Sequence, residues 1–93
     1  MIRSFRNPDT ERLFTRQGSR RLPPAVQNAA LRKLVILHGA GALTDLQLPP
    51  GNRLEKLRGD RAGQYSIRIN DQYRVCFQWR DGDAYNVEIA DYH

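Results

Sequence analysis

The chain has 93 residues, 40% of them hydrophobic and 27% charged, which predicts one domain over residues 1–93 and excludes a wholly disordered chain. Its one cysteine, Cys76, excludes an internal disulfide, and no apolar run approaches the roughly 20 residues of a membrane-spanning helix. A single cysteine suits a reducing cytoplasm, and the N-terminus lacks the apolar stretch of a secretory signal, so the chain is expected to be cytoplasmic and to have no membrane partner. Its net charge is +5.

The positive charge is concentrated in the first part of the chain. Residues 1–38 carry eight Arg and Lys side chains against Asp9 and Glu11, a net charge of +6, whereas the remaining residues carry −1. Nucleic acid is the commonest partner of such a segment, and acidic proteins or simple solvation are the alternatives. Arg20 and Arg21 are the candidate phosphate-binding residues in this part.

Helices are predicted in the first half of the chain. Apolar and polar residues alternate loosely over residues 1–6, which predicts a short strand. Asn7 and Pro8, which follow, are typical of a helix start. That helix is expected to end within residues 17–19. A second helix opens after Leu22, ends at Gly39 and carries apolar residues at helical spacing, namely Val26, Ala29, Ala30, Leu34 and Leu37. One more helical turn is expected within residues 40–48.

From residue 53 onward the hydrophobic period changes to two, which predicts strands. These are expected at residues 53–57, 64–69, 73–79 and 84–90, with hairpin connections at residues 70–72 and at Asp81-Gly82. The side chains expected to face the core are Tyr65, Ile67, Ile69, Tyr73, Val75, Phe77, Trp79, Tyr85, Val87 and Ile89. Helices followed by a meander of strands predict an α+β fold, with N-terminal helices packed on one face of a small antiparallel β-sheet and the other face open.

The open face is predicted to carry the chemistry. The alternation places Arg74 and Tyr92 there, together with Arg58 at the end of the first strand. Strict alternation sends Asp91 and His93 to the other side, so His93 reaches this face only if the chain bends near its end.

Metal-free RNA cleavage fits these residue types. Two histidines and one cysteine give no set with the spacing of a zinc site, so no metal and no other cofactor is expected. In RNA the neighbouring 2′-hydroxyl is itself the nucleophile, and the protein must supply only a base, an acid and positive charge. Taken singly, each candidate also has an ordinary explanation as a frayed terminus or a solvated strand face.

Each candidate residue has an expected part in this chemistry. His93 is the predicted proton carrier and Asp91 its orienting partner. Tyr92 could stack on a base or hydrogen-bond the 2′-hydroxyl. Phosphate contacts are expected from the arginine and lysine side chains of the second half, namely Arg74, Arg58, Lys56 and Arg61.

Four stretches of the sequence are distinctive: residues 49–77, PPGNRLEKLRGDRAGQYSIRINDQYRVCF, the ending VEIADYH, the opening MIRSF and the segment RRLPPAVQNAALRKL. In these stretches, which cover nearly the whole sequence, the chain resembles the HigB branch of the RelE/ParE toxin superfamily. This resemblance implies a RelE/ParE-like fold and the toxin of a type II toxin–antitoxin pair. Such toxins act as ribosome-dependent endoribonucleases that cut messenger RNA in the 30S decoding site and stop translation.

The resemblance also implies site residues and partners. Asp91, Tyr92 and His93 match the family's catalytic ending, Arg74 matches its arginine after the hairpin aromatic, and some relatives carry histidine where this chain has Glu55. The implied partners are a cognate helix-turn-helix antitoxin of the HigA type, the ribosomal A site and its message, and operator DNA only through the antitoxin. Two alternatives stay open, a ParE-like poison of DNA gyrase and a non-catalytic RNA- or antitoxin-binding module.

Overall fold

The computed structural model describes residues 1–92, and within them helices precede a four-stranded antiparallel sheet. The helices are α1 (Pro8–Phe14) and α2 (Pro24–Gly39), followed by the 3-10 turns η1 (Leu43–Gln47), η2 (Pro50–Asn52) and η3 (Gly59–Arg61). The strands are β1 (Glu55–Lys56), β2 (Tyr65–Arg68), β3 (Tyr73–Arg80) and β4 (Asp83–Asp91), paired in chain order. The predicted α+β fold is confirmed. No helix in the described part is long and apolar enough to cross a membrane.

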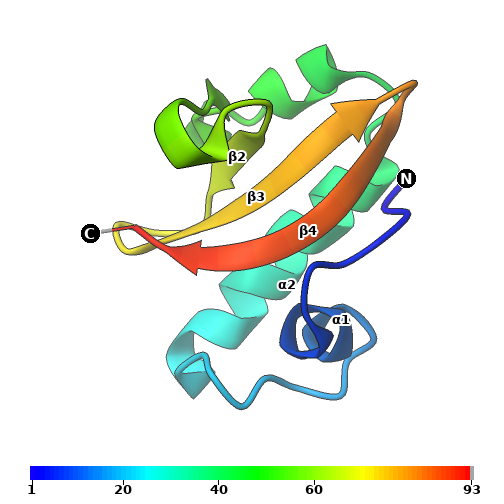
Figure 1. The fold of residues 1–93 in the computed structure, drawn as a ribbon. Helices are drawn as coiled ribbons and strands as arrows, with labels where there is room; N and C mark the ends of the chain where they lie inside the picture. The colour runs from blue at the N-terminus through cyan, green and yellow to red at the C-terminus, as the bar shows by residue number, and fades with distance from the viewer. Residues whose placement is uncertain (93) are drawn as a thin grey trace.

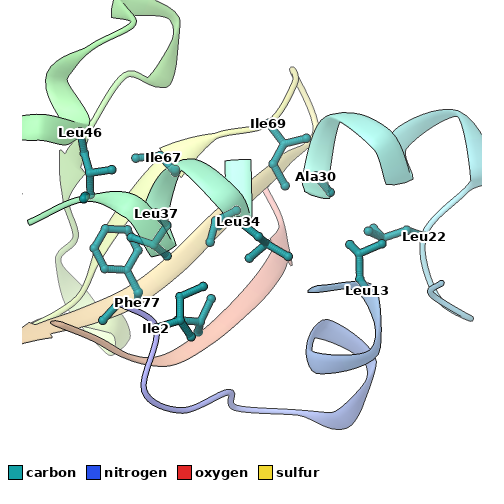
Figure 2. Packing of buried hydrophobic residues seen from close by; sticks show 14 residues of the cluster. Ile2, Leu13, Leu22, Ala30, Leu34, Leu37, Leu46, Ile67, Ile69 and Phe77 are labelled. Carbon is teal, nitrogen blue, oxygen red and sulfur yellow. The ribbon is translucent and has the colours of Figure 1, made fainter. Parts of the chain in front are cut away.

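Helix α2 covers one face of the sheet and supplies the centre of the core. In Figure 1 it crosses behind β3 and β4, with α1 beside it. Leu34 and Leu37 of α2 and Phe77 of β3 are fully buried together (Figure 2). Burial of one such side chain contributes about 1.5–3 kcal/mol, so this contact fixes the sheet against the helical layer.

The N-terminal residues follow the predicted pattern in part. Asn7 caps α1, because its Oδ1 accepts a hydrogen bond from the backbone N–H of Thr10 at 2.9 Å. The expected strand before it is reduced to isolated parallel bridges, in which Ile2 pairs with Ala84 and Phe5 with Val87. This segment runs along β4 (Figure 1) and covers the main-chain groups of that edge.

A β-bulge makes the predicted orientation of Tyr85 wrong. Cys76 pairs with Glu88 and Gln78 with Tyr85, so two residues of β4 face Phe77 alone. Asn86, at the bulge, has φ 52°. The extra residue reverses the alternation. Ala84 is therefore fully buried in the core, while the Arg80 guanidinium lies 4.3 Å from the centre of the Tyr85 ring.

The outer face of the sheet is not fully open, which corrects a second expectation. The segment with η3 folds over it and buries Leu57 against Cys76 and Ala90. An ion pair of 2.6 Å between Arg61 and Glu88 of β4 holds this segment in place. The first strand is also shorter than predicted, because Arg53 adopts a left-handed conformation with φ 43°.

The link between α1 and α2 is organised by the buried carboxylate of Asp9. It accepts hydrogen bonds from Ser19 Oγ at 2.5 Å and from the Arg20 N–H at 2.8 Å, and it pairs with Arg12 at 3.1 Å. Burial alone would raise the pKa of Asp9, but these hydrogen bonds and the Arg12 charge outweigh it and lower the pKa below its ordinary value of 3.8. The ionised carboxylate therefore stabilises the folded state.

Replacing Asp9 by Asn should lower the free energy of unfolding at pH 7 by about 1–3 kcal/mol, because charge-assisted hydrogen bonds are lost. A lowered folded-state pKa means that this contribution is present above the ordinary value of 3.8 and disappears as the pH falls through the lowered pKa. Urea unfolding at pH 7 and pH 3 should show the two proteins converging at acid pH. The exposed Glu11→Gln change is the matched control, and a pH-independent loss for Asp9→Asn would contradict the assignment.

Candidate functional site

A cleft of about 300 Å³ lies on the outer face, where the end of β4 meets the β2–β3 hairpin. Its lining residues are Arg53, Glu55, Arg68, Asn70, Asp71, Arg74 and Tyr92. The structure thus brings together Arg74 and Tyr92, as the alternation predicts. Sequence reasoning missed Arg68, although its place between Ile67 and Ile69 puts it on this face, opposite Arg74 in the strand register. Arg53, expected within the first strand, lies before β1 in the structure, and Asn70 lies in the β2–β3 hairpin, so the observed strand parity places neither of them.

Arg74 is buried, with 8% of its surface exposed, and its guanidinium is held on one side by neutral acceptors. Nε donates to the hydroxyl of Ser66 at 2.6 Å, and Nη2 donates to the carbonyls of Arg53 at 2.5 Å and Ser66 at 3.3 Å. Ser66 is itself fully buried. Within residues 1–92 no carboxylate lies within ion-pair distance of Arg74, so its charge is available to an anion in the cleft.

Tyr92 is placed by its main chain. Its N–H donates to the Gln72 carbonyl at 2.6 Å, and Gln72 Nε2 donates to Asp91 Oδ2 at 3.0 Å. Asn70 secures the same hairpin, since its Oδ1 accepts from the N–H groups of Gln72 and Tyr73 at 2.9 and 2.8 Å. Burial, followed by the adjacent Cys76 thiol, raises the pKa of the Tyr92 phenol, which therefore stays protonated at neutral pH and can donate a hydrogen bond.

The remaining predicted residues lie elsewhere or are engaged. Arg61 is bound to Glu88, and that hydrogen bond raises the pKa of Arg61. Lys56 pairs with Tyr65 and so shares the helix-covered side of the sheet, away from the cleft. Arg58 is exposed before η3 and does not line the cleft.

The helical layer and the end of the chain hold the other candidates. Arg20 and Arg21 are exposed in the α1–α2 connection. Asp91 is exposed at the end of β4 and bound by Gln72. His93 lies outside the described residues.

The arginine side chains of the cleft favour binding of an anion, and the cleft also contains a carboxylate that can exchange a proton. Arg68 pairs with the exposed Asp71, whereas Arg53 has no ion pair among the described residues. Glu55 pairs with Ser66 in the strand register and therefore lies on the same face as Arg74. Guanidinium, carboxylate and phenol groups thus line one hollow, an arrangement that can hold a phosphodiester and accept or donate protons beside it.

Sequence comparison gives relatives over the whole chain. Residues 3–93 match a family model described as the RelE-like toxin of the type II toxin–antitoxin system HigB. The chain is 46% identical to "Toxin HigB-1" of Vibrio cholerae over 90 residues, which span 96% of this chain and 95% of that protein. It is also 30% identical over 93 residues to "Endoribonuclease HigB" of Proteus vulgaris, with complete coverage of both chains.

Solved structures share the fold at low sequence identity. A point mutant of YafQ from E. coli has a TM-score of 0.64 and 12% identity, covering 98% of this chain and 91% of that chain. YoeB in the YoeB–YefM complex from Staphylococcus aureus has a TM-score of 0.57 and 18% identity, covering 100% and 98%. These likenesses establish the arrangement of helices and sheet.

Replacing Ser66 by Ala should lower the free energy of unfolding by about 1–3 kcal/mol, because Arg74 Nε loses its buried acceptor. The double change Ser66→Ala with Arg74→Met removes both partners and should cost less than the two single changes together. Urea denaturation of the unmodified protein, the two single variants and the double variant measures this coupling. Ser4→Ala, which removes an exposed acceptor for the Asn86 N–H, is the control, and strict additivity would show that the contact does not hold the guanidinium.

Proposed function

The chain belongs to the HigB family of RelE-like toxins from type II toxin–antitoxin systems, and we propose that it is an endoribonuclease that cuts messenger RNA on the ribosome. The observation that carries this proposal is the cleft in which Arg74, Glu55 and Tyr92 meet. The name of the Proteus vulgaris relative supports RNA cleavage. Ribosome dependence rests on the resemblance of the sequence.

The proposed reaction uses the RNA 2′-hydroxyl as nucleophile. Its oxygen attacks the adjacent phosphorus, its proton passes to a base of the protein, and the 5′-oxygen leaves with a proton from an acid. The products are a 2′,3′-cyclic phosphate and a 5′-hydroxyl end. The enzyme must therefore place one base and one acid on either side of a phosphate whose charge rises in the transition state.

Glu55 is the proposed base and His93 the proposed acid. Glu55 lines the cleft beside Arg74, and a carboxylate is a competent acceptor once the neighbouring arginines hold the substrate close. His93 follows Tyr92 directly in the sequence, and an imidazolium can donate a proton near neutral pH. Asp91 is proposed to orient the imidazole.

The arginines and Tyr92 are proposed to bind the substrate. Arg74 would contact the scissile phosphate through its remaining donors, because Ser66 and Arg53 already hold the rest of the guanidinium. Arg53 and Arg68 line the same cleft and would contact flanking phosphates. The protonated phenol of Tyr92 would stack on a base or donate to a ribose oxygen. One well-placed donor is worth about 10²–10³ in rate.

The wider partners follow from the same assignment. A toxin of this class has an antitoxin, and we propose a helix-turn-helix protein of the HigA type that alone contacts operator DNA. The exposed Arg20 and Arg21 would approach ribosomal RNA at the 30S A site. All these encounters would take place in the cytoplasm.

Primer extension on messages from cells expressing the toxin tests the cleavage. New 5′ ends within translated frames are expected, and His93→Gln should lower their yield by about 10²-fold or more because proton transfer is lost. The control is His38→Gln, since His38 Nδ1 accepts from the Ile2 N–H at 3.1 Å and lies in the helical layer. Intact messages with broken DNA would instead indicate a gyrase poison, and uncut messages with intact DNA a binding module.

Substitutions of Glu55 test whether this residue is the general base of the cleavage reaction. Glu55→Gln should lower the cleavage rate by about 10²-fold or more. Glu55→His should restore much of it, with the acid limb of the pH–rate profile moved up by about two units, because imidazole loses its proton at a higher pH than a carboxyl group. Single-turnover cleavage on programmed ribosomes at pH 5 to 8 measures both. An unchanged acid limb in Glu55→His would show that another group is the base.

A further inference from the structure

A second hollow lies on the helical layer, remote from the sheet face that carries the cleft. It measures about 470 Å³ and is lined by Arg16, Asn28, Leu31, Arg32, Val35 and Ile36. A neighbouring hollow of about 290 Å³ shares Arg16, Asn28 and Leu31 with it. The two form one groove, here called the α2 groove, between the end of α1 and the side of α2 that faces away from the sheet.

The α2 groove exposes apolar surface that the fold itself does not use. Leu34 and Leu37 already bury the sheet-facing side of α2. Leu31 and Val35 stand one turn apart on another side of the same helix, and Val35 remains 45% exposed. An apolar strip at helical spacing in a hollow of this size is typical of a surface that accepts a partner's side chains.

The charges around the groove select the kind of partner. Arg16 and Arg32 line it, and α2 contains no Asp or Glu. The buried acid nearby, Asp9, already pairs with Arg12 and accepts two further hydrogen bonds, from the Ser19 hydroxyl and the Arg20 N–H. A partner must therefore offer apolar side chains flanked by carboxylates. RNA fits less well, since its backbone would meet the carbon surface of Leu31, Val35 and Ile36.

The walls of the groove are fixed before any partner arrives. Gln27 Nε2 donates to the carbonyls of Ser19 at 3.1 Å and Leu22 at 3.0 Å, and its Oε1 accepts from the Ser19 N–H at 3.3 Å. Together with Asp9, these bonds hold the connection against the start of α2. A preformed site loses little conformational entropy on binding.

We propose that the α2 groove is the docking surface for the antitoxin, through an amphipathic segment with acidic residues beside its apolar face. This rests on the assignment of the chain as a toxin of a toxin–antitoxin pair. The apolar side chains of that segment would pack on Leu31 and Val35, and its carboxylates would pair with Arg16 and Arg32. The docking surface and the RNA cleft then use different layers of the molecule.

The test is titration calorimetry of the purified toxin with its cognate antitoxin. Val35→Glu should weaken binding at least tenfold, because a carboxylate enters the apolar strip and repels the acidic segment. Leu48→Glu is the matched control, since Leu48 is 69% exposed and lies outside the groove. The affinity of this variant for the antitoxin should stay within twofold of that of the unmodified toxin. Arg16→Glu with Arg32→Glu should also weaken binding and flatten its dependence on salt. Thermal unfolding confirms that each variant is folded.

Cleavage of translated messages is measured on the same variants, so that the two proposals can fail separately. Unchanged cleavage with lost antitoxin affinity supports the groove. Unchanged antitoxin affinity in Val35→Glu overturns the proposed docking surface. The proposal is also overturned if a groove variant still binds the antitoxin with unchanged affinity but loses ribosome binding or self-association. Absence of cleavage in the unmodified toxin would refute the ribonuclease assignment, while the calorimetry still decides the docking surface.

Discussion

The site depends on a buried guanidinium that the protein holds with neutral groups. Arg74 extends from β3 to the hydroxyl and carbonyl of Ser66 on β2 and to the carbonyl of Arg53 before β1. Burying a charge is costly unless its donors are satisfied, so these bonds tie three segments together. Because neutral acceptors leave the charge uncancelled, the constraint that orders the outer face also makes the cleft attractive to phosphate.

Much of the fold could be predicted because local patterns and tertiary packing agree. The cap at Asn7, the apolar spacing in α2 and the alternation in β3 each specify what the structure contains. The bulge at Asn86 could not be predicted, since nothing in the local sequence reports where two strands lose register. That single insertion accounts for the error at Tyr85.

The site was predictable only where it follows strand parity. Arg74 and Tyr92 were found because alternate residues share a face, and Arg68 could have been found in the same way. Arg53 contributes its carbonyl to Arg74 from a left-handed backbone conformation. Arg61 binds Glu88, which lies 27 positions later in the chain. Such long-range pairings depend on the folded chain, so periodicity does not reveal them.

The end of β4 is held in place by the β2–β3 hairpin. Tyr73 at the start of β3 pairs with Asp91 at the end of β4, so Tyr92 extends beyond the ladder. Its N–H finds the Gln72 carbonyl instead, in a hairpin whose own shape is set by the Asn70 side chain. The phenol is thereby positioned by main-chain bonds that do not depend on its chemistry. Anchored in this way, the Tyr92 side chain lines the edge of the cleft, where an anionic ligand can reach it without the protein having to open.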